Sequence, residues 1–293
     1  MKSYDELMLT DDFLFCRILE KNPELCKELA GRIIGRKIGR IVTLQDQKTI
    51  QVTPDGHGIR LDVYFEDDAE TVYDIEMQTG HYEEIPRRMR YYQGGIDQAV
   101  LEKGENYAHL RESWIIFICE KDVRREGRNL YTYSLRDDHD PSQVMDDGTH
   151  RVLFCLEGNQ QNLTEDQKQL IACMTGADTQ SALGLQIHRE VQEARRTAEW
   201  RRQYMKYEYD MYLARKDGWT EGHEKGREEG RVEGREEGRE EGREEGLRAL
   251  VATLCQYEPD PAKLLLAVRR NPAYENVTEE RLKEILQGEA IPS

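Results

Sequence analysis

The segment YDIEMQTG, residues 73–80, contains three polar residues that could act together in a chemical site. If the segment forms a strand, Asp74, Glu76 and Gln78 share one face, because successive side chains alternate between the faces of a sheet. Such a face is either solvated or holds a cation and a substrate. For an isolated pattern the solvated face is the more frequent case, so the neighbouring segments must decide.

Asp62 lies in IRLDVYF, residues 59–65, shortly before this segment. If the two segments pair as a hairpin around residues 66–70, a symmetric register sets Asp62 opposite Asp74. Glu76 is then the diagonal neighbour of Asp62 on the same face, about 7–8 Å away. A register shift of one residue would place the groups on opposite faces. The apolar face of the first strand is expected to contain Leu61, Val63 and Phe65.

Converging carboxylates suit a hard divalent cation. Mg²⁺ prefers oxygen ligands and typically binds one or two carboxylates together with water and substrate phosphate. A cation held in this way polarises a phosphoryl oxygen and lowers the pKa of water. Asp62 and Glu76 are therefore the candidate metal ligands. Gln78 can position water or phosphate by hydrogen bonds, but its neutral amide cannot act as a base.

Hydrophobic periodicity predicts the elements that must position these residues. Residues 1–40 have helical spacing, interrupted at Asn22 and Pro23, and a further helix is expected over residues 83–104. Apolar alternation predicts strands over residues 49–53, 59–65, 71–78, 113–120, 130–135 and 151–156. This order indicates a mixed α/β domain of five or six strands, flanked by helices, that ends near residue 160.

Beyond this domain the composition changes. Thr164 and Gln167 have the spacing of a capping box, which predicts a helix start, and a helical pattern covers residues 179–215. Residues 221–246 have glycine at every fourth position, with 11 acidic and six basic residues. Since each glycine costs a helix about 1 kcal/mol, we expect a solvated spacer that is partly helical or disordered. The predicted parts are a domain at 1–160, a helical extension at 161–220, the spacer at 221–246 and a small helical tail at 247–293.

Charge and cysteine usage restrict the function. The 293 residues carry a net charge of −16, and residues 1–160 alone hold 31 acidic against 21 basic residues. Nucleic-acid binding must therefore rest on a local basic patch or a bound metal. Six scattered cysteines without a CxxC pair predict a reduced, cytoplasmic protein with neither disulfide framework nor zinc site. No membrane span or signal peptide is expected, and His57 and His81 are expected at the surface.

The hairpin motif resembles that of the PD-(D/E)XK nuclease superfamily, and more narrowly that of the recombination-promoting nuclease and transposase group. Asp62 is followed after thirteen residues by Glu76, Met77 and Gln78. The group usually has this E-x-Q where the superfamily has E-x-K. The segment RRMRYYQ, residues 87–93, is similar to the helix of arginines and aromatics that follows the hairpin in the group.

The N-terminal segment DDFLFCRIL, residues 11–19, is similar to the opening motif of the same group. That motif has an acidic residue three positions before a phenylalanine, here Asp12 and Phe15. A lysine usually follows the phenylalanine, but Cys16 stands at this position. A glycine-rich charged tract and a helical tail are also common in such sequences.

The resemblance implies a restriction-endonuclease-like core, with a mixed central sheet flanked by helices, and a helical C-terminal extension. It implies that Asp62 and Glu76 bind Mg²⁺, or alternatively Mn²⁺. The Met77 backbone carbonyl would be a further ligand, and Asp12 would assist from the first helix. Gln78 would take the position of the usual lysine. The implied reaction is metal-dependent hydrolysis of DNA phosphodiester bonds in recombination or element mobility.

Two functions from different classes compete. The first is a DNA endonuclease, with Arg87, Arg88 and Arg90 as the local basic patch for DNA phosphates. The second is a catalytically weak nuclease-fold protein that acts through its helical tail as an assembly or interaction module, for which a homo-oligomer is a possible form. The acidic net charge favours the second function, whereas the intact set of Asp62, Glu76 and Gln78 favours the first.

Overall fold

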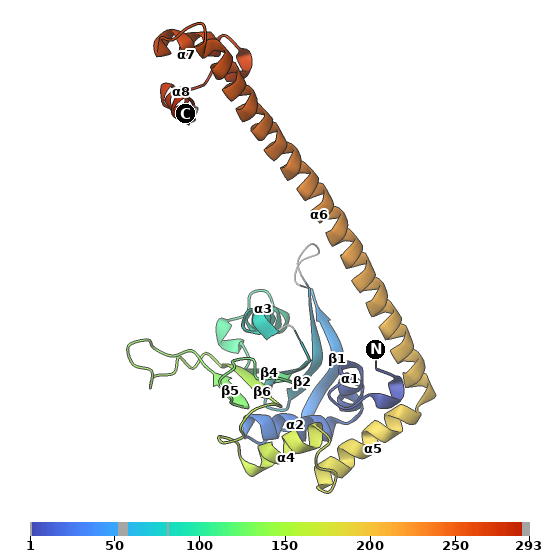
Figure 1. Ribbon diagram of the computed structural model, residues 1–293. Coiled ribbons are helices and arrows are strands. Elements are labelled where there is room, and N and C mark those ends of the chain that lie inside the picture. Colours follow the sequence, from blue (N-terminus) through green and yellow to red (C-terminus); the bar gives the residue numbers. More distant parts are fainter. Residues whose placement is uncertain (1, 52–57, 81, 289–293) are drawn as a thin grey trace. The chain divides into compact units, whose positions relative to one another are not determined.

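The computed structural model describes residues 2–51, 58–80 and 82–288, and the chain divides into two compact units, residues 1–207 and 208–293. The first unit contains a six-stranded sheet with the order β1-β2-β3-β4-β6-β5 (Figure 1). The β3–β4 and β4–β6 pairs are parallel, and the other three pairs are antiparallel. The strands are β1 (Ile41–Ile50), β2 (Ile59–Asp67), β3 (Val72–Gln78), β4 (Ser113–Cys119), β5 (Leu130–Tyr133) and β6 (Thr149–Cys155).

Helices cover both faces of this sheet (Figure 1). One face packs against α1 (Asp12–Lys21), α2 (Pro23–Ile34), α4 (Glu165–Met174) and α5 (Ala182–Arg196). The other face packs against α3 (Ile85–Val100). Phe65, Ile75 and Ile116 lie in three of the predicted strands and are fully buried. The predicted mixed sheet flanked by helices is confirmed.

Helix α6 (Ala198–Cys255) is continuous and supplies residues to both units. Residues 221–243, most of the glycine tract, are helical and exposed. In the second unit, the end of α6 packs with α7 (Pro261–Arg269) and α8 (Glu279–Gly288) around a small apolar cluster of Leu247, Val251, Leu264, Val268, Tyr274, Val277, Leu282 and Ile285. Within the described part of the chain, no helix is both long and apolar enough to cross a membrane.

Strand β1 begins at Ile41, eight residues before the predicted position. Residues 45–48 are all polar, so this strand lacks the apolar alternation on which the prediction depended. As the first strand in the sheet order, β1 pairs with β2 alone. Residues 52–57, which include His57 and most of the predicted turn, lie outside the described residues, as does His81.

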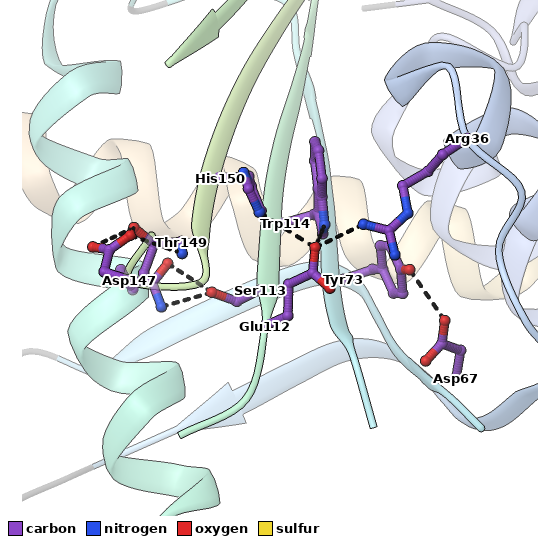
Figure 2. Close-up of polar contacts among 10 residues, drawn as sticks. Arg36, Asp67, Tyr73, Glu112, Ser113, Trp114, Asp147, Thr149 and His150 are labelled. Atoms are coloured by element: carbon purple, nitrogen blue, oxygen red, sulfur yellow. Dashed lines mark hydrogen bonds and ion pairs between the residues drawn. The ribbon is translucent and has the colours of Figure 1, made fainter. Parts of the chain in front are cut away.

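The β2–β3 hairpin differs in register from the symmetric one that we expected. Val63 pairs with Ile75 and Tyr64 with Asp74, so Asp62 lies opposite Glu76 rather than Asp74. The cause is the turn that follows β2. The Asp67 carboxylate accepts hydrogen bonds from the backbone N–H groups of Ala69 and Thr71. It also accepts one from the Tyr73 hydroxyl (Figure 2). These contacts accompany the extension of β2 to Asp67 and a register that is shifted by two residues. Such a shift alone would leave the faces unchanged, but the side chains of β2 change face near Asp62.

The alternation of side chains is interrupted in the middle of β2. Leu61 packs in the apolar cluster next to α3, whereas Val63 and Phe65 pack in the cluster on the opposite face. The prediction that these three residues share one face is therefore wrong for Leu61. Across from Asp62 on β1, Gln47 has a left-handed φ of 48°. A left-handed residue is incompatible with a regular pleat, and the inward face of β2 changes at this point.

A compact polar cluster lies where β4 begins (Figure 2). The Glu112 carboxylate accepts hydrogen bonds from Arg36 Nη1 at 2.7 Å and Trp114 Nε1 at 3.0 Å. His150 Nε2 lies 3.3 Å from the same carboxylate, and the rings of His150 and Trp114 stack with centroids 4.0 Å apart. Although partial burial alone would raise the pKa of Glu112, the hydrogen bonds from Arg36 and Trp114 lower it below its usual value.

Candidate active site

Asp62 on β2 and Glu76 on β3 are joined by reciprocal hydrogen bonds between the two strands. The Asp62 backbone N–H donates to Glu76 Oε1 at 2.9 Å, and the Met77 backbone N–H donates to Asp62 Oδ2 at 3.2 Å. Only 9% of Asp62 and 2% of Glu76 is exposed. The structure thus places the two residues that the sequence pattern selected next to each other, and Met77 contacts Asp62 through its amide. The Asp62 carboxylate lies beside Asp12 and Cys16 of α1, whereas the Glu76 carboxylate contacts Arg88 of α3.

Helix α1 adds two further groups to this site. One donor atom each from Asp12, Cys16 and Asp62 lies within 4.8 Å of the other two. Cys16 Sγ lies 3.8 Å from Asp12 Oδ1, to which it can donate a weak hydrogen bond. The Tyr207 hydroxyl donates to Asp12 Oδ2 at 2.6 Å. Tyr207 belongs to α6, beyond the predicted domain boundary, and the sequence pattern around it showed only a helix rich in aromatic residues.

Arg88 of α3 points into the site rather than away from it. Its Nη1 donates to Gln78 Oε1 at 2.7 Å, and its Nη2 donates to Glu76 Oε2 at 3.2 Å and to the Tyr92 hydroxyl at 3.0 Å. The neighbouring Arg87 and Arg90 are exposed. The predicted trio of arginines is therefore divided between the site and the surface.

Asp74 is a third carboxylate in the same region and is fully buried on β3. Neither of its oxygens has a hydrogen-bond partner among the described residues. A buried carboxylate without partners is costly unless it holds a proton or lies near a cation. The sequence pattern suggested a solvated face or a supporting role for Asp74, and the structure excludes the solvated face.

The comparison with known families now bears on this geometry. A family model described as PD-(D/E)XK nuclease family transposase matches residues 9–171, more than half of the chain. The chain belongs to this family. No curated protein and no solved structure matches it. The matched region includes Asp12, Asp62, Glu76 and Arg88, whereas Tyr207 lies outside it.

Burial controls the protonation of the acidic residues in the candidate site. It raises the pKa of Asp62 to about 7, and the charge of Asp12 adds to this effect. Burial, followed by the charges of Asp74 and Asp62, raises the pKa of Glu76 well above its usual value. Burial and the charge of Asp62 do the same for Asp74. Near neutral pH these carboxyl groups must share protons or be neutralised by a cation.

The donor set of this site fits a divalent cation. Asp12 and Asp62 offer converging carboxylate oxygens, the ligands that Mg²⁺ and Mn²⁺ accept. Glu76 borders this pair and is held by the Asp62 amide and by Arg88. The buried Asp74 carboxyl, whose oxygens have no hydrogen-bond partner among the described residues, lies on the same strand as Glu76. A cation would offset the cost of keeping these groups ionised.

Proposed function

We propose that this transposase-family protein is a Mg²⁺-dependent DNA endonuclease that acts in recombination or in the movement of genetic elements. The observation that carries the proposal is the buried, interlocked pair of Asp62 and Glu76, with Asp12 brought to Asp62 from α1. A carboxylate with a purely structural role is expected to have enough cations and hydrogen-bond donors around it to balance its negative charge. Here burial raises the pKa values of Asp62 and Glu76, and the site keeps the groups at a cost in stability.

In this proposal Asp62 and Asp12 hold the cation, Mg²⁺ or alternatively Mn²⁺, and Glu76 together with the Met77 carbonyl completes the set. When bound, the cation supplies positive charge that stabilises the phosphate in the transition state. Arg88 fixes Glu76 and Gln78 by hydrogen bonds. Gln78 Nε2 also donates to the Gly80 carbonyl, so its second amide hydrogen would be the one offered to a phosphate oxygen or to water.

The proposed DNA contact lies on α3. Arg87 and Arg90 are exposed on the helix that also carries Arg88 into the site. Arginines of this kind bind backbone phosphates and do so without reading sequence. A short basic patch beside an acidic site reconciles DNA binding with a net charge of −16, because only the local potential must attract the DNA.

The second candidate is a catalytically weak protein that works as an assembly module. It is favoured by the acidic charge and by the helices of residues 208–293, which have an apolar cluster of their own. In this alternative the acidic site would be a remnant that binds no cation strongly, and the helical part would carry the function.

A nicking assay on supercoiled plasmid, paired with melting curves, separates the two candidates. We expect the full chain to nick DNA in Mg²⁺ or Mn²⁺ and to be inactive in EDTA. Binding of the cation should also raise the melting temperature, since a ligand at 100 times its Kd stabilises the folded state by about 2.7 kcal/mol. A protein that neither nicks DNA nor gains stability from either cation would support the assembly module instead.

A further inference from the structure

Cys16 occupies an unusual place for a structural cysteine. It lies one helical turn after Asp12 on α1, so that both side chains project from the same side of the helix. Its sulfur lies 3.8 Å from Asp12 Oδ1, and the group of Asp12, Cys16 and Asp62 has donor atoms within 4.8 Å of one another. The Tyr207 hydroxyl occupies Asp12 Oδ2, so that Oδ1 is the oxygen beside the thiol.

Cys26 of α2 shows what a purely packed cysteine looks like in this protein. It lies in the same apolar cluster, and burial alone raises the pKa of its thiol. Burial also raises the pKa of the Cys16 thiol, and the charges of Asp62 and Asp12 raise it further. A small apolar side chain would pack as well as a thiol in the core. Without a cation the Cys16 thiol offers these carboxylates only a weak hydrogen bond, whereas a bound cation would join all three donors.

We propose that Cys16 is a ligand of the cation site formed with Asp12 and Asp62, and that it makes this site prefer thiophilic divalent metals such as Co²⁺ and Zn²⁺ over Mg²⁺. The inference rests on the proposed metal-dependent function and concerns which cations the site binds most tightly; Mg²⁺, which the two carboxylates accept, would still support cleavage. Thiolate is a soft ligand that binds Co²⁺ and Zn²⁺ far better than Mg²⁺, whereas carboxylates accept all three. The thiol proton passes to the buffer when the metal binds.

No local pattern in the sequence indicates such a site, because the chain has no pair of cysteines at ligand spacing. The other donors are aspartates, and Asp62 comes from β2 rather than from α1. Sequence analysis therefore predicted no zinc site. The fold assembles one from a helical pair, Asp12 and Cys16, and a strand residue.

Absorption spectroscopy of the full chain with Co²⁺ tests the assignment without an activity measurement. A thiolate bound to Co²⁺ gives a charge-transfer band in the near ultraviolet that carboxylates do not give. We expect the band in the wild-type protein, its loss in Cys16→Ser and Asp62→Asn, and its retention in Cys255→Ser, which changes an exposed cysteine of α6. Cys16→Ser should weaken Co²⁺ binding at least about tenfold and change Mg²⁺ binding less than about threefold.

The possible results separate this inference from the proposed function. Wild-type protein that binds Co²⁺ without the band, or a band that persists in Cys16→Ser, overturns the role of Cys16 and leaves the metal-dependent function intact. Wild-type protein that binds neither Co²⁺ nor Mg²⁺ overturns both. The wild-type spectrum requires no variant to fold, and circular dichroism identifies any variant that does not.

Discussion

Two acidic regions lie at opposite ends of strands β3 and β4, and their surroundings shift the pKa values of their carboxyl groups in opposite directions. Glu112 precedes β4 next to the start of β3, while Glu76 lies about five residues further along, roughly 17 Å away. Glu112 is surrounded by Arg36, Trp114 and His150, and the pKa of Glu112 is lowered (Figure 2). Glu76 is buried beside Asp62, and its pKa is raised.

The difference shows how a structural carboxylate can be told from a functional one. At Glu112 the fold supplies every charge and donor that the ionised form needs, so the group needs no further ligand. At Asp62 and Glu76 the fold supplies two backbone amides and Arg88, and leaves excess negative charge in a buried place. The second arrangement costs stability, and a bound cation removes that cost.

The largest expected effect is on cleavage. Asp62→Asn keeps an oxygen that can accept the Met77 N–H but removes the charge that holds the cation, so DNA cleavage should fall on the order of 10³-fold, as expected for several kcal/mol of lost charge stabilisation. Glu112→Gln should leave cleavage unchanged. The measurement is plasmid nicking in Mg²⁺ with both variants. If both variants lost cleavage activity equally, the Asp62 region would be no more important for cleavage than the Glu112 region.

The second effect is a pH dependence of opposite sign at the two ends. The folded pKa of Asp62 is about 7, above the usual value of 3.8, so the folded state retains a proton that the unfolded state has lost. The stability of the metal-free protein should therefore fall as pH rises from about 4 to about 7, by an amount on the order of 4 kcal/mol from Asp62 alone. The lowered pKa of Glu112 acts in reverse, since its contribution is lost as the pH falls.

Urea unfolding of the wild type and of Asp62→Asn between pH 4 and pH 8, in EDTA, measures this dependence. The difference between the two curves should grow with pH, with the variant the more stable at pH 8. A saturating divalent cation should reverse that order. If the difference stays flat across this range, Asp62 titrates normally and its burial has no consequence for stability.

The third effect compares the arginine at each end. Arg88→Ala leaves Glu76 buried without its cationic partner, and we expect a loss of about 2 kcal/mol in the free energy of unfolding. Arg36→Ala should cost less than about 1 kcal/mol, because its side chain is 44% exposed and Glu112 keeps Trp114 and His150. Urea unfolding at neutral pH measures both. Losses of similar size would mean that the Glu76 contact is no more buried in solution than the Glu112 contact.

Much of the fold was accessible from the sequence because it depends on local signals. The capping box at Thr164 and Gln167 forms as predicted, since its two bonds need residues only three positions apart. Apolar alternation identified both strands of the hairpin, which pair with each other as predicted. The register could not be predicted, because it depends on the contacts that the Asp67 side chain makes in the following turn.

The site was predictable in its residue types and only partly in its geometry. Spacing placed Asp62 and Glu76 on adjacent strands, but the direction of Arg88 depends on how α3 packs on the sheet. Tyr207 could not be found at all, because it reaches Asp12 across 195 residues of sequence. Contacts of that length come from the packing of whole helices, for which a single sequence carries no local pattern.

The smallest expected effect concerns DNA binding by exposed arginines. It tests whether the surface near the candidate site binds DNA while the surface near Glu112 does not. Arg90→Ala should weaken DNA binding up to about tenfold and reduce the slope of log K against log salt by about 1, the change expected for one lost phosphate contact. Its stability should change by less than about 0.5 kcal/mol, since the side chain is exposed. Arg36→Ala removes the same charge at the end of the sheet away from the site, and it should leave the slope unaltered. Fluorescence anisotropy with a short labelled duplex in EDTA, at several salt concentrations, measures both variants.

If the two substitutions lower the slope equally, DNA responds to the net charge of the chain and α3 is not its binding surface. If only Arg90→Ala lowers it, the basic patch lies beside the acidic site, where phosphate must be delivered for hydrolysis.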